Sequence, residues 1–237
     1  MKKGMLLGIV LFAMVLLSGC ELVAIQGKGP VVAKEYPLAG FSGVDVSNAM
    51  KVVVKKGERF QVTVRIRQNL LPYLEVDKRG DVLHVGMQSG HNYSNLGAEV
   101  LVVMPELRSF TLSGACEGVL EGEWQVPDIQ VSLSGASSLK GTVAAEDGKI
   151  EVSGASSVAL NGSARSLVAE ASGASRLDMR GFTVDRLRVE LSGASHGEMQ
   201  VVKSLDAEAS GASSFDYTGD PSIERSDTSG ASSINRR

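Results

Sequence analysis

Apolar and polar residues alternate through the second half of the chain in a pattern that predicts β-strands. Around each copy of a recurring Ser-Gly-Ala motif, the residues one, three and five positions before the serine are mostly apolar, and those between them are mostly polar. A period of two places alternate side chains on opposite faces of a strand. Apolar residues then recur five and seven positions after the serine. We therefore expect one strand before each motif and a second strand after it.

The motif itself returns at an almost constant interval. Its copies are 21, 19, 19, 20, 18 and 19 residues apart and begin at Ser113, Ser134, Ser153, Ser172, Ser192, Ser210 and Ser229. Such a period is typical of a solenoid, in which each repeat buries its apolar face against its neighbours. Crossovers between parallel strands of one sheet are almost always right-handed. The pattern over residues 109–237 therefore predicts an all-β fold, a right-handed parallel β-helix with coils of about 19 residues.

The glycine of each motif is expected to form the corner between the two strands. Glycine adopts positive φ without a steric penalty, and it lets one backbone approach another closely. The alanine that follows is expected to fit inside the corner. The predicted corner glycines are Gly114, Gly135, Gly154, Gly173, Gly193, Gly211 and Gly230.

Residues 36–108 contain β-patterns without a regular spacing, and we expect them to form an irregular β-rich cap with the first coils. Gly57 and Arg79-Gly80 indicate turns, a hairpin is expected around residues 55–59, and residues 69–73 allow one helical turn. Ser47-Asn48-Ala49 is similar to a degenerate motif, because asparagine tolerates positive φ. The expected strands are residues 43–46, 51–55, 60–67, 74–76, 82–85 and 99–104.

The N-terminus has the features of an export signal. Lys2 and Lys3 precede an apolar segment at residues 5–17 that is too short to span a membrane as a mature helix. The sequence Leu17-Ser18-Gly19-Cys20 resembles a bacterial lipobox. This resemblance implies that residues 1–19 are a signal peptide, that Cys20 is acylated by chains such as palmitate, and that residues 20–35 form a tether. The alternative is an ordinary secretory signal.

Composition narrows the partners. The formal net charge of −3 and the absence of a basic stripe exclude a general nucleic-acid footprint. Cys116 has no partner once Cys20 is acylated, and it stands where the other motifs have serine. It is interpreted as a small packing residue, with a reactive thiol as the alternative.

Four features together resemble the GIN-domain family of auto-transporter adhesin head domains. They are the lipobox, the segment at residues 41–46 with the sequence FSGVDV, the segment at residues 103–107 with the sequence VMPEL, and the serial Ser-Gly-Ala coils. The resemblance covers nearly all of the mature chain and implies a right-handed β-helix in the bacterial envelope. It supplies no catalytic residue.

A column of carboxylates is expected on the outer face, two residues before each motif. Its members are Glu151, Glu170, Glu190, Glu208 and Asp227. Like charges in register need compensation, which Lys149, Arg188 and Arg225 could supply on the same face. The column is therefore interpreted as a solvated charge ladder, and the alternative is a surface for divalent cations or cationic ligands.

The remaining candidates have structural explanations in the repeat. Residues 193–197 match the Gly-x-Ser-x-Gly pattern of a hydrolase, but that motif requires a strand-to-helix turn, and Ser195 already belongs to a column of motif serines. Paired serines such as Ser137-Ser138 could meet glycans or ice, although such hydroxyls more often satisfy the backbone at a bend. The three histidines show no metal-ligand spacing, so no metal and no cofactor are expected.

The sequence favours a non-catalytic protein of the cell envelope. We expect a lipid-anchored adhesin or scaffold that binds a protein or glycan partner. Glu21, which is not the aspartate of an inner-membrane retention signal, favours an outer membrane. The alternative is a polysaccharide-processing enzyme, because β-helices also host lyases and hydrolases. The last coil has no cap element, so a homo-oligomer through the C-terminal end of the solenoid is also expected.

Overall fold

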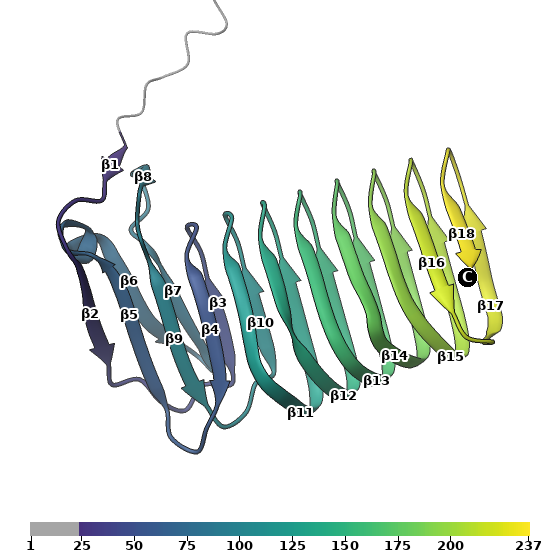
Figure 1. Ribbon diagram of the computed structural model, residues 1–237, viewed down its shortest axis with the longest axis horizontal. Coiled ribbons are helices and arrows are strands. Elements are labelled where there is room, and N and C mark those ends of the chain that lie inside the picture. Colours follow the sequence, from purple (N-terminus) through teal and green to yellow (C-terminus); the bar gives the residue numbers. More distant parts are fainter. Residues whose placement is uncertain (1–23) are drawn as a thin grey trace, which may run out of the picture.

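A computed structural model describes residues 24–237 of the chain (Figure 1). The chain forms a right-handed β-solenoid of about seven turns with coils of about 19 residues, which confirms the predicted fold class. The predicted signal peptide and the predicted acylation site Cys20 lie outside the described residues. Among residues 24–237, no helix is long and apolar enough to cross a membrane.

Each coil of the regular part has one strand that enters the motif corner and another that leaves it. Neighbouring coils pair in parallel, with Glu151 opposite Glu170 and Leu139 opposite Val158. The long strands run from one corner, around the bend on the other side of the solenoid, to the next corner. The strands of this part are β10 (Ser109–Leu112), β11 (Glu117–Leu133), β12 (Ser138–Val152), β13 (Ser157–Ala171), β14 (Arg176–Leu191), β15 (His196–Ala209), β16 (Ser214–Thr218), β17 (Ser222–Thr228) and β18 (Ser233–Arg236).

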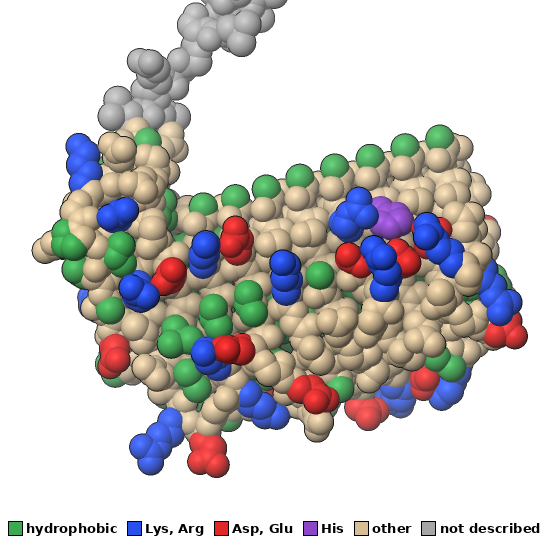
Figure 2. Space-filling view, viewed as in Figure 1, with side chains coloured by type: hydrophobic (Ala, Val, Ile, Leu, Met, Phe, Trp, Pro, Cys, Tyr) green, Lys and Arg blue, Asp and Glu red, His purple; other side chains and the backbone are tan. Residues whose placement is uncertain are grey.

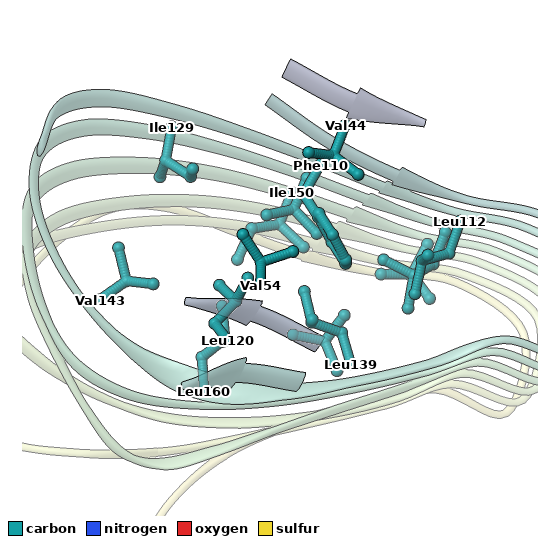
Figure 3. Packing of buried hydrophobic residues seen from close by; sticks show 14 of the residues in the cluster. Val44, Val54, Phe110, Leu112, Leu120, Ile129, Leu139, Val143, Ile150 and Leu160 are labelled. Carbon is teal, nitrogen blue, oxygen red and sulfur yellow. The ribbon is translucent and has the colours of Figure 1, made fainter. Parts of the chain in front are cut away.

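The inward columns predicted from the alternation form the core (Figure 3). Ile150, Leu139 and Leu160 are buried from three different columns. Gly118 and Gly197 interrupt one of these columns for a steric reason. A Cβ on Gly118 would lie 2.8 Å from the ring of Phe110, and one on Gly197 would lie 3.1 Å from the ring of Phe215. The two glycines therefore make room for two large buried rings.

The corner glycines have the backbone conformation that the sequence predicts. All seven have positive φ, between 67° for Gly114 and 76° for Gly135, Gly173 and Gly211. Asn48 adopts φ 68° in the degenerate motif, and it lies beneath Gly114. The expectation for the alanines is wrong. They are exposed on the outer edge of each corner, and the next residue of each motif, such as Ser137, points inward instead.

The N-terminal part contains coils that do not follow the order of the chain. β3 (Gly43–Val46) and β4 (Lys51–Lys56) form a coil between two later segments. On one side it pairs with β10 and β11, and on the other with β7 (Val82–Met87) and β9 (Glu99–Met104). The expected first coil at Ser47-Asn48-Ala49 therefore exists, but the next coil along the axis is formed by residues 82–104.

Antiparallel strands complete this end. β2 (Val31–Tyr36) pairs with β5 (Gln61–Arg67), and β6 (Leu74–Arg79) pairs with β7. A 3-10 helix, η1 (Gln68–Tyr73), connects β5 to β6 and confirms the helical turn predicted at residues 69–73. β1 (Ile25–Gln26) pairs with β8 (Tyr93–Ser94) above this region. Residues 25–26 and 31–36 thus belong to the folded domain and not to a free tether.

The hairpin expected around residues 55–59 is wrong. β4 and β5 follow one another in the sequence, but they do not pair with each other. β9 lies between them, parallel to β4 and antiparallel to β5. Local turn chemistry predicted the change of direction but could not reveal a strand inserted from farther along the chain.

Candidate functional site

A shallow groove follows the motif corners along the axis of the solenoid. We call it the axial groove, and its volume is about 600 Å³. The carboxylates of the predicted column form one side, and the first serines of the motifs form the other. Its polar lining residues are Thr111, Ser132, Ser134, Glu151, Ser153, Glu170, Ser172, Glu190, Ser192, Glu208, Ser210, Asp227, Thr228 and Ser229.

The solenoid places the same pair of groups in successive coils of the groove. Glu170 pairs in register with Glu151 on one side and Glu190 on the other, and Glu208 and Asp227 continue the column. Adjacent strands in a sheet are about 4.8 Å apart, so one carboxylate and one hydroxyl recur at about this interval. The serine side was not predicted as part of a site, although its constant phase in the repeat was visible in the sequence.

The predicted cations do compensate the carboxylates. Lys149 Nζ lies 2.7 Å from Glu151 and 3.9 Å from Glu170. Arg188 pairs with Glu190 at 2.7 Å, whereas Arg225 bridges Glu208 and Asp227. The interpretation as a charge ladder therefore agrees with these contacts. These ion pairs are exposed, so each contributes little to stability.

Titration of the groove follows from the same contacts. The hydrogen bond from Lys149, assisted by one from Ser132, lowers the pKa of Glu151 against the opposing effect of burial. The pKa values of Arg188 and Arg225 are raised, chiefly by their hydrogen bonds to Glu190 and Asp227. The Glu151 carboxylate, Arg188 and Arg225 therefore stay charged, and the charged side chains that line the groove itself are all carboxylates.

The inward serine of each motif satisfies the backbone, which is the structural role favoured by the sequence. Ser137 Oγ donates to the Ser134 carbonyl at 2.9 Å and accepts the Cys116 N–H at 3.2 Å. Ser156 Oγ accepts the Ser137 N–H at 3.1 Å. Because Ser137 and Ser156 are only 1% exposed, the inward hydroxyls are not available to a ligand.

Ser195 has the same role, and its surroundings do not support a nucleophile. Its hydroxyl donates to the Ser192 carbonyl at 2.8 Å, and the side chain is buried. The neighbouring His196 points to Ser214 Oγ, at 2.8 Å from Nδ1, and not to Ser195. Strands and not a helix follow the corner, so the elbow geometry of a hydrolase is absent at this motif.

Cys116 is a packing residue at the same position. Its thiol contacts the Ser113 carbonyl at 3.2 Å and lies 3.5 Å from the Met50 N–H. Burial raises the pKa of this thiol in spite of those contacts. A buried thiol with a raised pKa is a poor nucleophile. Across residues 24–237, no group of three or more His, Cys, Asp or Glu side chains is arranged to hold a metal ion.

Two further surfaces lie outside the axial groove. The exposed alanines form a row along one long edge of the molecule (Figure 2), and its members are Ala115, Ala136, Ala155, Ala174, Ala194, Ala212 and Ala231. A depression of about 500 Å³ lies over β4, β5, β9 and β11, where Val53, Leu101 and Val119 point outward. The sequence analysis missed it, because these strands are neighbours only in the folded chain.

Comparisons with known proteins agree with this architecture. A family model described as "Putative auto-transporter adhesin, head GIN domain" matches residues 40–221. A search of curated proteins gave no match.

Solved structures share the fold at low sequence identity. A protein from Bacteroides fragilis described as a "putative adhesin" is 15% identical, with a TM-score of 0.85 over 90% of this chain and 100% of its own. A Parabacteroides merdae protein with the same description is 14% identical, with a TM-score of 0.72 over 90% of this chain and 99% of its own. A Parabacteroides distasonis protein described as a "putative lipid binding protein" is 14% identical, with a TM-score of 0.75 over 90% of this chain and 99% of its own.

The family and these neighbours are described by binding or adhesion, and not as enzymes. The repeated corners, the serial coils and the family match over most of the chain lead to one assignment. The chain belongs to the GIN-domain family of auto-transporter adhesin head domains.

Proposed function

We propose that the protein is a non-catalytic, lipid-anchored adhesin or scaffold of the bacterial cell envelope that binds an extended protein or glycan ligand in the axial groove. The observation that carries this proposal is that successive coils present the same two kinds of side chain to the groove. Each coil from Glu151 to Asp227 presents to the groove one carboxylate and, two residues later in the chain, one motif hydroxyl. Such a row fits a ligand that is itself linear and carries donors at regular intervals.

The chemistry of the groove favours hydrogen-bond donors and cations over anionic ligands. Carboxylates accept hydrogen bonds, and serine hydroxyls both donate and accept them. The sugar hydroxyls or amino groups of a glycan, or basic side chains of an extended peptide, would meet these requirements. The arrangement does not support the polysaccharide-processing alternative, because the carboxylates form a line bridged by cations and do not converge on one point.

The anchor is supported by the lipobox that ends at Cys20 and by the membership of the chain in an adhesin family. An outer-membrane location follows from Glu21, under the same proposal. Mass spectrometry of the mature protein tests the anchor: an acylated Cys20 as the first residue is expected, and a mature chain that starts elsewhere would contradict it.

Ligand binding can be tested with two matched sets of substitutions in the lipidated protein. The groove variant combines Glu170→Gln, Glu190→Gln and Glu208→Gln, whereas the control variant combines Glu121→Gln, Glu123→Gln and Glu146→Gln on other surfaces. On arrays of glycans and extended basic peptides, the groove variant should bind about tenfold more weakly than the control. Equal binding by the two variants would contradict the proposal. The proposal would also be contradicted if the unchanged protein bound no ligand and deletion of the protein left cell adhesion unaltered.

A further inference from the structure

The described chain enters the fold at one end of the solenoid, a short distance after the lipobox cysteine. β1 begins at Ile25 and lies with β8 at the N-terminal end (Figure 1). The five residue steps from Cys20 to Ile25 span at most about 18 Å, because an extended chain covers about 3.3–3.6 Å per residue. An acyl chain on Cys20 therefore holds this end of the solenoid beside the bilayer.

We infer that the surface formed by β1, η1 and β8 rests on the anionic headgroups of the membrane that holds the anchor. This inference depends on the lipid anchor proposed above. It adds a second contact, made by the folded domain itself, which orients the solenoid with its N-terminal end at the membrane. The axial groove then begins away from the bilayer, where a ligand can reach it.

The segment that begins at Ile25 is hydrogen-bonded to the rest of the domain, so only the residues before Ile25 separate the domain from Cys20. Ile25 N–H donates to the Asn92 carbonyl at 2.8 Å, and Gly27 N–H donates to the Ser94 carbonyl at 2.8 Å. Lys28 N–H donates to Asn69 Oδ1 at 2.6 Å. The segment from Ile25 to Lys28 is therefore held by the β8 region on one side and by η1 on the other, and the domain must follow the anchor.

This surface has the aromatic composition of a membrane interface. Tyr73, His91 and Tyr93 form a cluster, with ring centroids 5.7 to 6.1 Å apart. Tyr73 and Tyr93 are only partly buried, as are Ile25 and Leu71 beside them. Tyrosine rings are enriched at the headgroup level, where one side of the ring is apolar and its hydroxyl is hydrated.

Charge gives the surface its orientation. Lys28 is exposed, and among residues 24–237 its ammonium group has no carboxylate within ion-pair distance. Residues 24–108 contain 11 Lys and Arg against 8 Asp and Glu, whereas residues 109–237 contain 11 against 18. Anionic headgroups attract basic residues within a Debye length and repel acidic ones. The N-terminal part as a whole is therefore less acidic than the repeat coils, which anionic headgroups repel more strongly.

The test uses the full-length lipidated protein in vesicles of phosphatidylethanolamine and phosphatidylglycerol that carry a headgroup quencher. A fluorophore is attached at Ser94→Cys in β8 or at Ser222→Cys in β17, both of which are exposed. The native Cys116 is fully buried and does not compete for the label. We expect the label at position 94 to be quenched several-fold more than the label at position 222.

The contribution of charge is tested by Lys28→Glu, with Lys140→Glu as the matched control in the middle of the solenoid. Lys28→Glu should reduce quenching at position 94, and Lys140→Glu should not. Equal quenching at positions 94 and 222, or no effect of Lys28→Glu, would overturn the inference while the anchor stands. Mass spectrometry of the same sample tests the proposed acylation of Cys20 independently. A mature protein without acyl chains on Cys20 would contradict the proposed anchor.

Discussion

The backbone of Gly173 packs directly on the backbone of Gly154. A Cβ built on Gly173 would lie 2.6 Å from the Gly154 carbonyl oxygen, which also accepts the Ala174 N–H at 2.7 Å. The same contact recurs between Gly193 and Gly173 and between Gly211 and Gly193. The motif glycine is therefore required twice, once by its positive φ and once by the coil next to it.

Gly173→Ala should lower the free energy of unfolding by about 3 kcal/mol. The left-handed conformation costs an alanine about 1–2 kcal/mol, and the overlap with the neighbouring backbone adds a similar amount. Gly122→Ala is the control, because Gly122 has φ 84° but nothing within 4 Å of its Cβ position. Urea unfolding of both variants separates the cost of positive φ, which both share, from the cost of the backbone overlap, which only Gly173→Ala has. Equal midpoints would show that the coils do not press on one another at the corners.

Ser156→Ala should destabilise the protein by about 1–3 kcal/mol, the cost of leaving a buried donor without a partner. The donor in question is the Ser137 N–H, which Ser156 Oγ accepts from the neighbouring coil. The next residue, Ser157, points outward and provides the control, since Ser157→Ala should change stability by less than about 0.5 kcal/mol. Thermal unfolding gives both values, and similar losses in the two variants would count against the proposed role of the inward hydroxyl.

The Cys116 thiol should be inert in the folded protein. It is fully buried, and burial raises its pKa, so little thiolate is available at neutral pH. A chromogenic disulfide reagent should therefore react only after denaturant is added. Cys116→Ser should be tolerated within about 1 kcal/mol, because it changes little volume and serine occupies this position in the other motifs. Rapid modification under native conditions would contradict the packing role.

Asp216 should make the stability of the last coil dependent on pH. Burial tends to raise the pKa of this carboxyl, but hydrogen bonds from Asn235 at 3.1 Å and Arg237 at 2.7 Å outweigh burial and lower it. A lowered folded-state pKa stabilises the protein above the unfolded pKa, and this contribution is lost as the pH falls through the folded value.

Asp216→Asn should therefore cost about 1 kcal/mol at neutral pH, since its Arg237 partner is exposed. The difference between the variant and the unchanged protein should begin to narrow below a pH of about 4, where an unfolded aspartate becomes protonated, and it should disappear as the pH falls through the lower pKa of the folded carboxyl. Urea midpoints measured across this range give the result. A difference that stays constant with pH would exclude Asp216 as the titrating group.

The regular coils were predictable because each strand pairs with the same segment one period later. The alternation alone was enough to assign Ile150 and Leu139 to the core, and the interval alone aligned Glu170 with Glu190. The direction of the alanines was not predictable. Alanine and serine are both small enough for either side of a corner, and only the hydrogen bonds of Ser137 and Ser156 decide which residue points inward.

The N-terminal part was predictable strand by strand but not in its pairing. Each expected strand exists, and Asn48 adopts the positive φ predicted for it. No repeat spacing links β9 to β4 and β5, however, and the position of β9 between them depends on contacts between distant segments. The apolar depression with Val53 and Val119 was hidden for the same reason.

The most direct test of the in-register stack is a set of distances between spin labels on the alanine row. Pairs are placed at Ala155 and Ala212, at Ala155 and Ala231, and at Ala136 and Ala231, all of which are exposed. If the corners are stacked at the spacing of β-strands, the backbone separations should be about 14, 19 and 24 Å, an increase of about 4.8 Å for each added coil. Distances that do not increase by one constant step per coil would contradict the solenoid and every site built on it.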